Sequence, residues 1–305
     1  MNSHPTPHDL TAHAEQRAGL LHGFCAYAFW GMLPLYFKLL PDVSAFELVA
    51  HRIIWSVVFL AILLANMRLY PALTAALGQP RVIGALILSA SLIAANWLAY
   101  VLAVASNHVV AASLGYFLNP LVNVLIALVF LHEKLSRRQL VAILIAGCGV
   151  AILAAGELTT LWISLTLAIS FAFYGLVRKL VAVPAAVGLM VETLALTIPA
   201  IAVLAWYQSH GSLAFGRAPI ETILLIALGA VTSIPLILFA SAARKLSMIS
   251  LGLLQYVAPS LQFLTGVFLF GEKLSPDRWA SFGLIWIALI LFVWDSVSTA
   301  RRVRR

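Results

Sequence analysis

The sequence predicts an all-α membrane protein of ten transmembrane helices, arranged as two inverted five-helix repeats. Three observations lead to this prediction: an apolar composition, a succession of apolar stretches of bilayer length, and a segment that is written twice. Apolar residues make up 63% of the 305 residues and charged residues 10%, against about 45–50% and about 25% in soluble domains. A bilayer accepts this much apolar surface, whereas a water-soluble fold does not.

The apolar stretches are each near the length that a helix needs to cross about 30 Å of hydrocarbon. They cover residues 19–38, 45–66, 81–104, 109–131, 138–155, 160–178, 184–207, 219–241, 248–270 and 278–296. Most connections are short, so successive helices are expected to be antiparallel neighbours. The predicted organisation is a tail at 1–18, a first repeat at 19–155, a second repeat at 160–296 and a basic tail at 297–305.

The N-terminal residues 1–18 are polar and do not resemble a cleaved signal, because further spans follow the first one. The spacing of His4, His8, His13 and His22 matches no ligand template. We therefore expect a disordered, solvated tail, with no metal and no cofactor. The two cysteines, Cys25 and Cys148, both fall in predicted spans, so no disulfide framework is implied.

The positive charges are distributed unevenly over the two sets of loops and tails. One set carries 14 Lys and Arg residues and the alternating set carries four. The positive-inside rule then predicts that both termini lie in the cytoplasm, here on the inner side of a bacterial inner membrane. The terminal RRVRR reads as a topology anchor that touches anionic lipid, and nucleic acid is not an expected partner.

The duplicated segment indicates an internal repeat. Residues 120–136 and 259–275 are identical at six of 17 positions, ending in Glu-Lys-Leu-Ser in both copies. Ala-Phe-Trp-Gly at 28–31 matches Ala-Phe-Tyr-Gly at 172–175, and Glu47 and Glu192 follow at nearly equal distances. Because five helices form each copy, the second copy enters the membrane in the opposite orientation. Inverted repeats of this kind are typical of secondary transporters.

The shared Glu-Lys-Leu-Ser ending is interpreted as structural. Ser136 and Gln139 form the pattern of a capping box, and Ser275-Pro276 reads as an N-cap followed by proline at the first helical position. Glu133 and Glu272 are expected to be polar residues of the turns between adjacent helices.

Two prolines, Pro120 and Pro259, occupy matching places about midway along predicted spans, where each is expected to bend its helix. Polar side chains accompany both of them: Asn119, Asn123, Gln255, Tyr256 and Gln262. Two interpretations remain open for this group, namely the lining of a central cavity or packing with internal hydrogen bonds.

The densest polar cluster of the spans is FELVAHRIIWS at 46–56, which contains Glu47, His51 and Arg52. Arg52 and Glu192 are predicted at similar depths from opposite faces, and ionisable residues so deep are usually paired or functional. Either Arg52 and Glu192 form a structural ion pair, or Arg52 binds an anionic group of a substrate while Glu47, His51 or Glu192 carries a proton. Further cavity candidates are Asn96, Tyr100, Trp30 and Tyr36.

At these residues the chain resembles the drug/metabolite transporter superfamily with paired EamA-type domains, and within it the RarD branch, a group named for chloramphenicol sensitivity. The resemblance covers residues 19–296 and is carried by FWGMLPLYFKLL, FELVAHRIIWS, NWLAYVLAVASNHVVAASLGYFLNPLVN, SFAFYGLVRKL and LGLLQYVAPSLQFLTGVFLFGEKLS. It implies ten helices, cytoplasmic termini and a central cavity for the export of small metabolites. One departure is His132, where the family usually has glycine.

The expected function is secondary active transport of small metabolites or drugs, with efflux of amino-acid-like or amphipathic compounds by alternating access. The expected partners are a small-molecule substrate, the lipid bilayer, coupling protons and a second copy in a homodimer. The alternatives are a membrane-embedded enzyme and a metabolite channel. No HExxH, GxSxG or phosphate-loop motif is present, so the enzyme is disfavoured, and mostly apolar helices offer no obvious continuous polar path for a channel.

Overall fold

The computed structural model describes residues 7–105, 109–155, 161–269 and 276–302, and all regular structure in this part of the chain is helical. The all-α prediction is therefore confirmed. The elements are α1 (Pro7–Phe37), α2 (Ala45–Asn66), α3 (Tyr70–Leu77), α4 (Pro80–Ala105), α5 (Val109–Phe130), α6 (Arg137–Ala155), α7 (Leu161–Leu180), α8 (Ala185–Ser209), α9 (Pro219–Lys245), α10 (Met248–Leu254), α11 (Val257–Leu264), η2 (Thr265–Leu269) and α12 (Pro276–Arg302).

Within the described residues, eight helical segments are long and apolar enough to cross a bilayer. They include α10, α11 and η2 taken together as Met248–Leu269, whereas α5 contributes a shorter apolar stretch, Leu114–Phe130. The protein is therefore an integral membrane protein, and the count of ten spans stays a prediction. The short helix α3 was not predicted. It begins with a proline in its first turn, and the Tyr70 hydroxyl donates to the Ala61 carbonyl of α2 at 2.9 Å.

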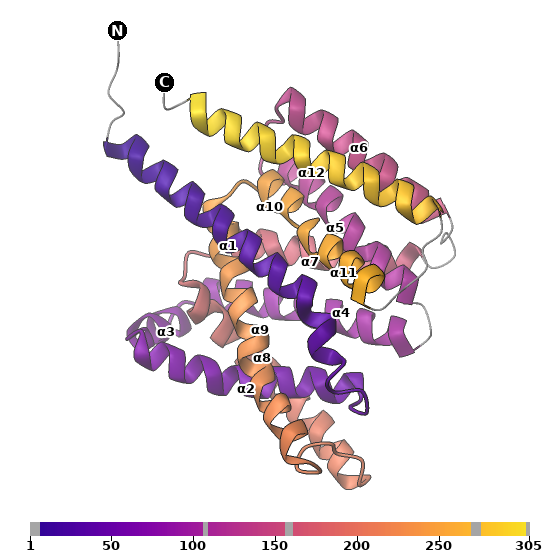
Figure 1. Ribbon diagram of the computed structural model, residues 1–305. Helices are drawn as coiled ribbons and strands as arrows, with labels where there is room; N and C mark the ends of the chain where they lie inside the picture. Colours follow the sequence, from indigo (N-terminus) through magenta and orange to yellow (C-terminus); the bar gives the residue numbers. More distant parts are fainter. Residues whose placement is uncertain (1–6, 106–108, 156–160, 270–275, 303–305) are drawn as a thin grey trace.

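Helices that the sequence repeat makes equivalent have equivalent neighbours. Helix α1 packs on α9, and its counterpart α7 packs on α4, which is the counterpart of α9. Helix α1 also packs on α11, and α7 packs on α5, which is the counterpart of α10 and α11 together. Helix α2 packs on α9 as α8 packs on α4. Three further contacts join a helix to its own counterpart: α2 to α8, α6 to α12 and α5 to α10 (Figure 1). Figure 1 also shows the start of α1 and the end of α12 on the same side of the molecule.

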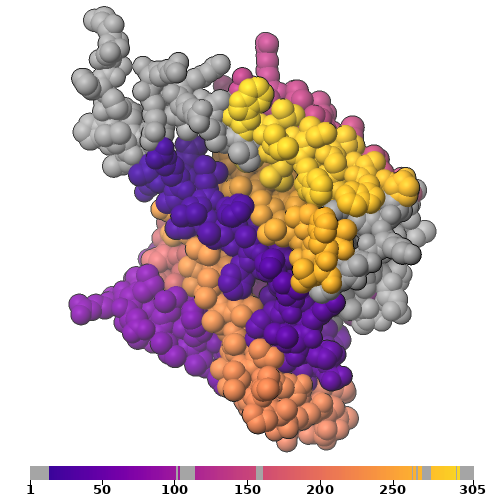
Figure 2. All heavy atoms as spheres, in the orientation of Figure 1, coloured from indigo at the N-terminus to yellow at the C-terminus, as the bar shows by residue number. Residues whose placement is uncertain are grey.

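The start of α6 has the predicted capping box. The Ser136 amide donates to Gln139 Oε1 at 2.9 Å, and the Gln139 amide donates to Ser136 Oγ at 3.1 Å. Ser136 Oγ also donates to Asp295 Oδ2 of α12 at 2.8 Å, which ties this helix start to its counterpart helix. In the face shown in Figure 2, the orange atoms of α10 and α11 lie between the indigo α1 and the yellow α12.

A glycine allows α9 to lie directly on α2. A Cβ added at Gly229 would lie 2.2 Å from the Trp55 carbonyl oxygen, so only a residue without a side chain fits this crossing. The crossing is also held by Ser56, whose Oγ donates to the Gly229 carbonyl at 3.3 Å. Because residues three apart share a helix face, this contact directs Thr232 of α9 toward Arg52 of α2.

Candidate functional site

The Arg52 side chain extends from α2 toward α4 and α9. Its Nε donates to Thr232 Oγ1 of α9 at 3.0 Å. Its guanidinium carbon lies 4.6 Å from the centre of the Trp97 ring of α4, a cation–π arrangement. Arg52 therefore contacts α9 of the predicted second repeat and α4 of the predicted first repeat.

Two tyrosines complete the surroundings of the guanidinium. Tyr100 of α4 and Tyr116 of α5 both lie within electrostatic range of Arg52, and their ring centres are 6.1 Å apart. Among the described residues, the terminal nitrogens of Arg52 form no hydrogen bond and no carboxylate lies within 4 Å of them. Since a guanidinium keeps its charge in proteins, this group is a charged double donor without an anionic partner.

Of the two alternatives left open for Arg52, the structural ion pair with Glu192 does not form in the structure. Glu192 Oε1 instead lies 3.2 Å from Arg178 Nη1, and it accepts from Ser89 Oγ of α4 at 2.6 Å. The physical reason is the short connection between α7 and α8. It allows Arg178, near the end of α7, to fold back on α8, where it also donates to the Ala185 carbonyl at 2.9 Å.

Arg178 was missed by the sequence reasoning, which counted it among the loop charges that set orientation. It is buried in the last turn of α7. The sequence does contain a signal for the position of the Arg178 side chain. Gly188 lies four residues before Glu192, on the same face of α8. A Cβ at Gly188 would lie 2.0 Å from Arg178 Nη1, so the glycine makes the space that the guanidinium occupies.

Glu47 and His51 are close together, but they serve the connection between α8 and α9. Glu47 Oε1 accepts from the Ala214 amide at 2.7 Å and lies 3.5 Å from His51 Nε2. The His51 ring stacks on Phe215 with ring centres 5.3 Å apart. These contacts anchor the 210–218 connection to α2, and the adjacent Arg52 projects from another face of the helix.

Several other predicted cavity residues hold helices together. Asn96 donates to the Leu167 carbonyl at 2.8 Å and to Ser170 Oγ at 3.1 Å, which joins α4 to α7. Gln262 Nε2 donates to the Trp30 carbonyl at 3.3 Å, joining α11 to α1. Tyr36 of α1 donates to the Leu224 carbonyl of α9. The Trp30 ring packs in an aromatic cluster whose other members are Tyr27, Phe171, Tyr174 and Phe239.

A second polar group lies where α1 and α5 meet α10 and α11. Its members are fully buried, with no more than 4% of their surface exposed: Tyr27, Asn119, Asn123, Gln255 and Tyr256. Each has a side-chain polar atom without a hydrogen-bond partner in the described structure. Tyr27, which sequence reasoning did not select, lies beside Gln255. We call these five residues the amide cluster.

The chain breaks its helix at the amide cluster. Proline has no amide hydrogen, so Pro259 cannot donate to the Gln255 carbonyl four residues earlier. The Ala258 amide bonds to this carbonyl instead, at 3.2 Å, in the tighter three-residue pattern. Helix α10 therefore ends at Leu254 and α11 begins at Val257, with Gln255 and Tyr256 between them.

The two matching prolines differ in their effect. Pro120 lies inside the continuous helix α5, whereas Pro259 lies just beyond the break between α10 and α11. The two copies pack on each other here, since a Cβ at Gly252 would lie 3.0 Å from Asn123 Cβ and 3.1 Å from the Pro120 carbonyl oxygen. The sequence predicted a bend at each proline; in the structure α5 continues through Pro120, whereas the second copy is interrupted between α10 and α11.

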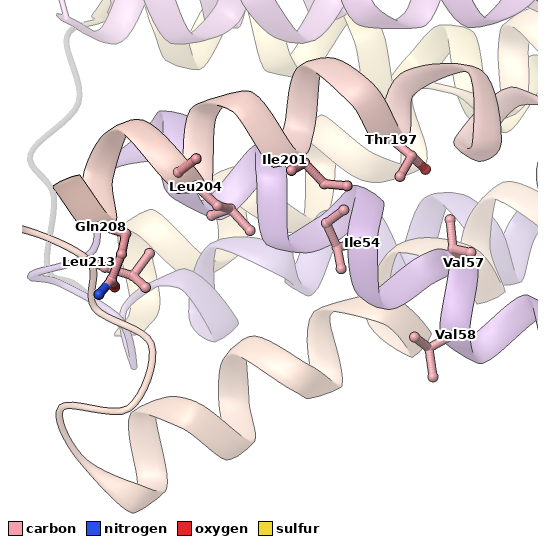
Figure 3. A pocket seen from close by; sticks show the side chains of 9 residues that line it. Ile54, Val57, Val58, Thr197, Ile201, Leu204, Gln208 and Leu213 are labelled. Carbon is pink, nitrogen blue, oxygen red and sulfur yellow. The ribbon is translucent and has the colours of Figure 1, made fainter.

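An apolar groove of about 460 Å³ lies elsewhere, between α2 and α8 (Figure 3). Aliphatic side chains dominate its lining, and Val58 and Ile201 are 43% and 54% exposed on the outside of the bundle. The groove contains none of the predicted site residues, so it is not the candidate site. Within the described residues, no group of three His, Cys, Asp or Glu side chains could hold a metal ion.

Comparison with known proteins agrees with these features. The EamA-like transporter family matches residues 17–155. A protein named RarD from Streptomyces exfoliatus is 43% identical over 97% of this chain and 94% of its own length. Protein RarD from Escherichia coli (strain K12) is 41% identical over 95% of this chain and 99% of its own length.

A more distant relative is named chloramphenicol-sensitive protein RarD, from Pseudomonas aeruginosa. It is 33% identical over 94% of this chain and 97% of its own length. A solved crystal structure with 20% identity superposes with a TM-score of 0.71, covering 90% of this chain and 96% of the other. That similarity shows the shared fold.

The bundle of apolar helices, with charged and amide side chains at the contacts between its halves, defines a membrane transporter of the drug/metabolite superfamily. The chain belongs to the EamA-like transporters, in the RarD branch.

Proposed function

We propose that the chain is a secondary active transporter that exports small metabolites or drugs by alternating access between two inverted five-helix repeats. The observation that carries this proposal is the position of Arg52. It contacts α4 of the first proposed repeat and α9 of the second, and its terminal nitrogens have no anionic partner among the described residues. A ligand anion bound there would contact both halves, so its binding would depend on their relative arrangement.

The equivalent neighbours of equivalent helices support the alternating part of the proposal. Exchange of the two arrangements needs two similar units in contact, and α2 with α8, α5 with α10, and α6 with α12 provide such contacts. Orientation in the membrane can be tested with reporter fusions. Fusions at Arg305 and within 132–138 should report the cytoplasm, and fusions near Lys273 should report the opposite side. A cytoplasmic signal at Lys273 would contradict the inverted arrangement.

Protons are the proposed coupling ions. Two buried pairs in the spans join a carboxylate to a basic group: Glu47 with His51, and Glu192 with Arg178. Buried ionisable groups of this kind form proton relays in transporters. Substrate flux into vesicles should follow an imposed pH gradient and be lost when a protonophore removes that gradient. Flux that persists unchanged with the protonophore would indicate facilitated diffusion.

The deciding experiment uses the purified protein in liposomes with a panel of amino acids, their acylated derivatives and chloramphenicol, the last because a relative is named for it. Saturable, gradient-dependent flux is expected, and it should be lost in Arg52→Gln. The matched control is Arg81→Gln, which removes an exposed arginine at the start of α4. Chemical turnover without vectorial movement would indicate an enzyme, and wild-type kinetics in Arg52→Gln would remove Arg52 from the mechanism.

A further inference from the structure

The site around Arg52 and the amide cluster are connected by two helices. On α5, Tyr116 lies beside Arg52, and Asn119 and Asn123 follow at three and seven residues on the same face. Seven residues correspond to about 10 Å along a helix axis. The charged donor and the amides are therefore separated by the scale of one small molecule.

Helix α9 makes the same connection independently. Thr232 accepts the hydrogen bond from Arg52, and Phe239 follows seven residues later. The Phe239 ring lies 6.2 Å from the Tyr27 ring of the amide cluster. Two helices from different repeats thus lead from Arg52 to the amide cluster.

The two ends of this stretch differ in charge. Arg52 supplies a positive charge at one end. The amide cluster consists of amide and hydroxyl groups, which donate and accept hydrogen bonds without carrying charge. At least one side-chain polar atom of each member is buried without a hydrogen-bond partner among the described residues, an arrangement that costs free energy unless a partner arrives.

No carboxylate is free to balance an ammonium group at the amide cluster within the described part of the chain. The charge of Glu192 is balanced by Arg178 through Oε1, although its Oε2 is buried without a hydrogen-bond partner. Glu47 accepts from the Ala214 amide at the connection between α8 and α9. An ammonium group brought to the amides would be a buried charge without a counter-ion, which is strongly unfavourable.

We propose, on the basis of the proposed transport function, that the ligand is a monocarboxylate whose other polar end is uncharged, as in N-acylated amino acids, and not a zwitterionic amino acid. The carboxylate binds the terminal nitrogens of Arg52. The neutral end, an amide or hydroxyl, takes the partnerless atoms of Asn123, Gln255 and Tyr27. The charge difference between the two ends sets both the specificity and the orientation of the bound molecule.

The test measures binding to the detergent-purified full chain for three probes of one shape: N-acetylphenylalanine, its C-terminal amide and phenylalanine. N-acetylphenylalanine is expected to bind at least about tenfold more tightly than either of the other two, a difference equivalent to one good polar interaction. Equal or tighter binding of phenylalanine overturns the proposal, and so does the absence of N-acetylphenylalanine binding.

Variants test which residues bind the carboxylate of the ligand and which bind its neutral end. Arg52→Gln should bind N-acetylphenylalanine no better than its amide. Asn123→Leu and Gln255→Leu should lose the preference for the acetylated over the free amino group. If these leucine variants fail to fold, Tyr27→Phe takes their place, because it removes one hydroxyl with little change in volume. The matched control is Gln208→Leu, which changes a glutamine at the outward groove between α2 and α8. An unchanged preference in both Arg52→Gln and Tyr27→Phe contradicts the assignment.

Flux of the same probes in liposomes separates this inference from the proposed function. Saturable flux with a preference for phenylalanine refutes the ligand class and leaves transport in place. The predicted binding preference without any flux refutes transport and leaves the ligand class in place.

Discussion

The carboxylate of Glu133, in the predicted first repeat, accepts a hydrogen bond from the Met248 amide of the predicted second repeat at 2.8 Å. Its second oxygen accepts from the Ile249 amide at 3.2 Å. These amides open α10 and have no acceptor within their own helix. A residue predicted to be a simple polar turn residue therefore caps a helix of the other repeat.

Removal of this cap is expected to destabilise the contact between the repeats. Glu133→Ala should lower the stability of the purified protein by about 0.5–2 kcal/mol, the usual cost of losing a helix cap, while Glu133→Gln, which keeps an acceptor, should lose less. Thermal melting in detergent measures both. Lys134→Ala is the adjacent exposed control, and a Glu133→Ala melting curve that matches it would show that the cap contributes no stability.

His132 is expected to be strained. Its φ of 51° lies in the left-handed region, which costs a residue with a side chain about 1–2 kcal/mol. The departure from the family's glycine noted in the sequence thus has a backbone cost. His132→Gly should raise the melting temperature, whereas His132→Ala should not. A lower melting temperature in the glycine variant would mean that the imidazole makes contacts that outweigh the strain.

The pair of Arg178 and Glu192 is expected to stabilise the fold, in addition to its proposed place in proton coupling. Either Arg178→Gln or Glu192→Gln leaves a buried charge without its partner and should cost about 3–5 kcal/mol. The double variant should be more stable than at least one single variant, as measured by melting of the purified proteins. By contrast, combining Glu192→Gln with Arg52→Gln should recover nothing, because these two side chains do not pair. Recovery of stability in that combination would indicate that Arg52 and Glu192 interact, contrary to the structure.

The two prolines should differ when they are replaced. Pro259→Ala supplies an amide hydrogen for the Gln255 carbonyl and should favour a continuous helix through residues 248–264, with insertion intact and flux impaired. Pro120→Ala should have the smaller effect, because α5 is already continuous at that position. Flux assays of both variants, normalised to the amount of inserted protein, test the difference. Equal losses would show that the break is not the functional feature.

Local sequence determined most of the architecture. Most helix positions followed from apolar length, because a span must satisfy its backbone within one segment, and α6 begins at the predicted capping box of Ser136 and Gln139. The tails are exceptions: α1 begins at Pro7, within the segment predicted to be disordered, and α12 continues to Arg302. The break near Pro259 also follows from one residue, since a missing amide hydrogen is a local property. The short helix α3 was missed because its eight residues contain no span-length signal.

The partners of the buried charges were decided only by tertiary structure. Depth along a helix placed Arg52 and Glu192 near each other, but depth does not give the direction in which a side chain leaves its helix. The reach of Arg178 across a short connection and the space left by Gly188 gave Glu192 its partner. The same packing directed Arg52 toward Thr232 and Trp97 and left its terminal nitrogens without an anion among the described residues. Sequence sets which polar groups enter the membrane, and the angles at which helices pack decide which of them meet.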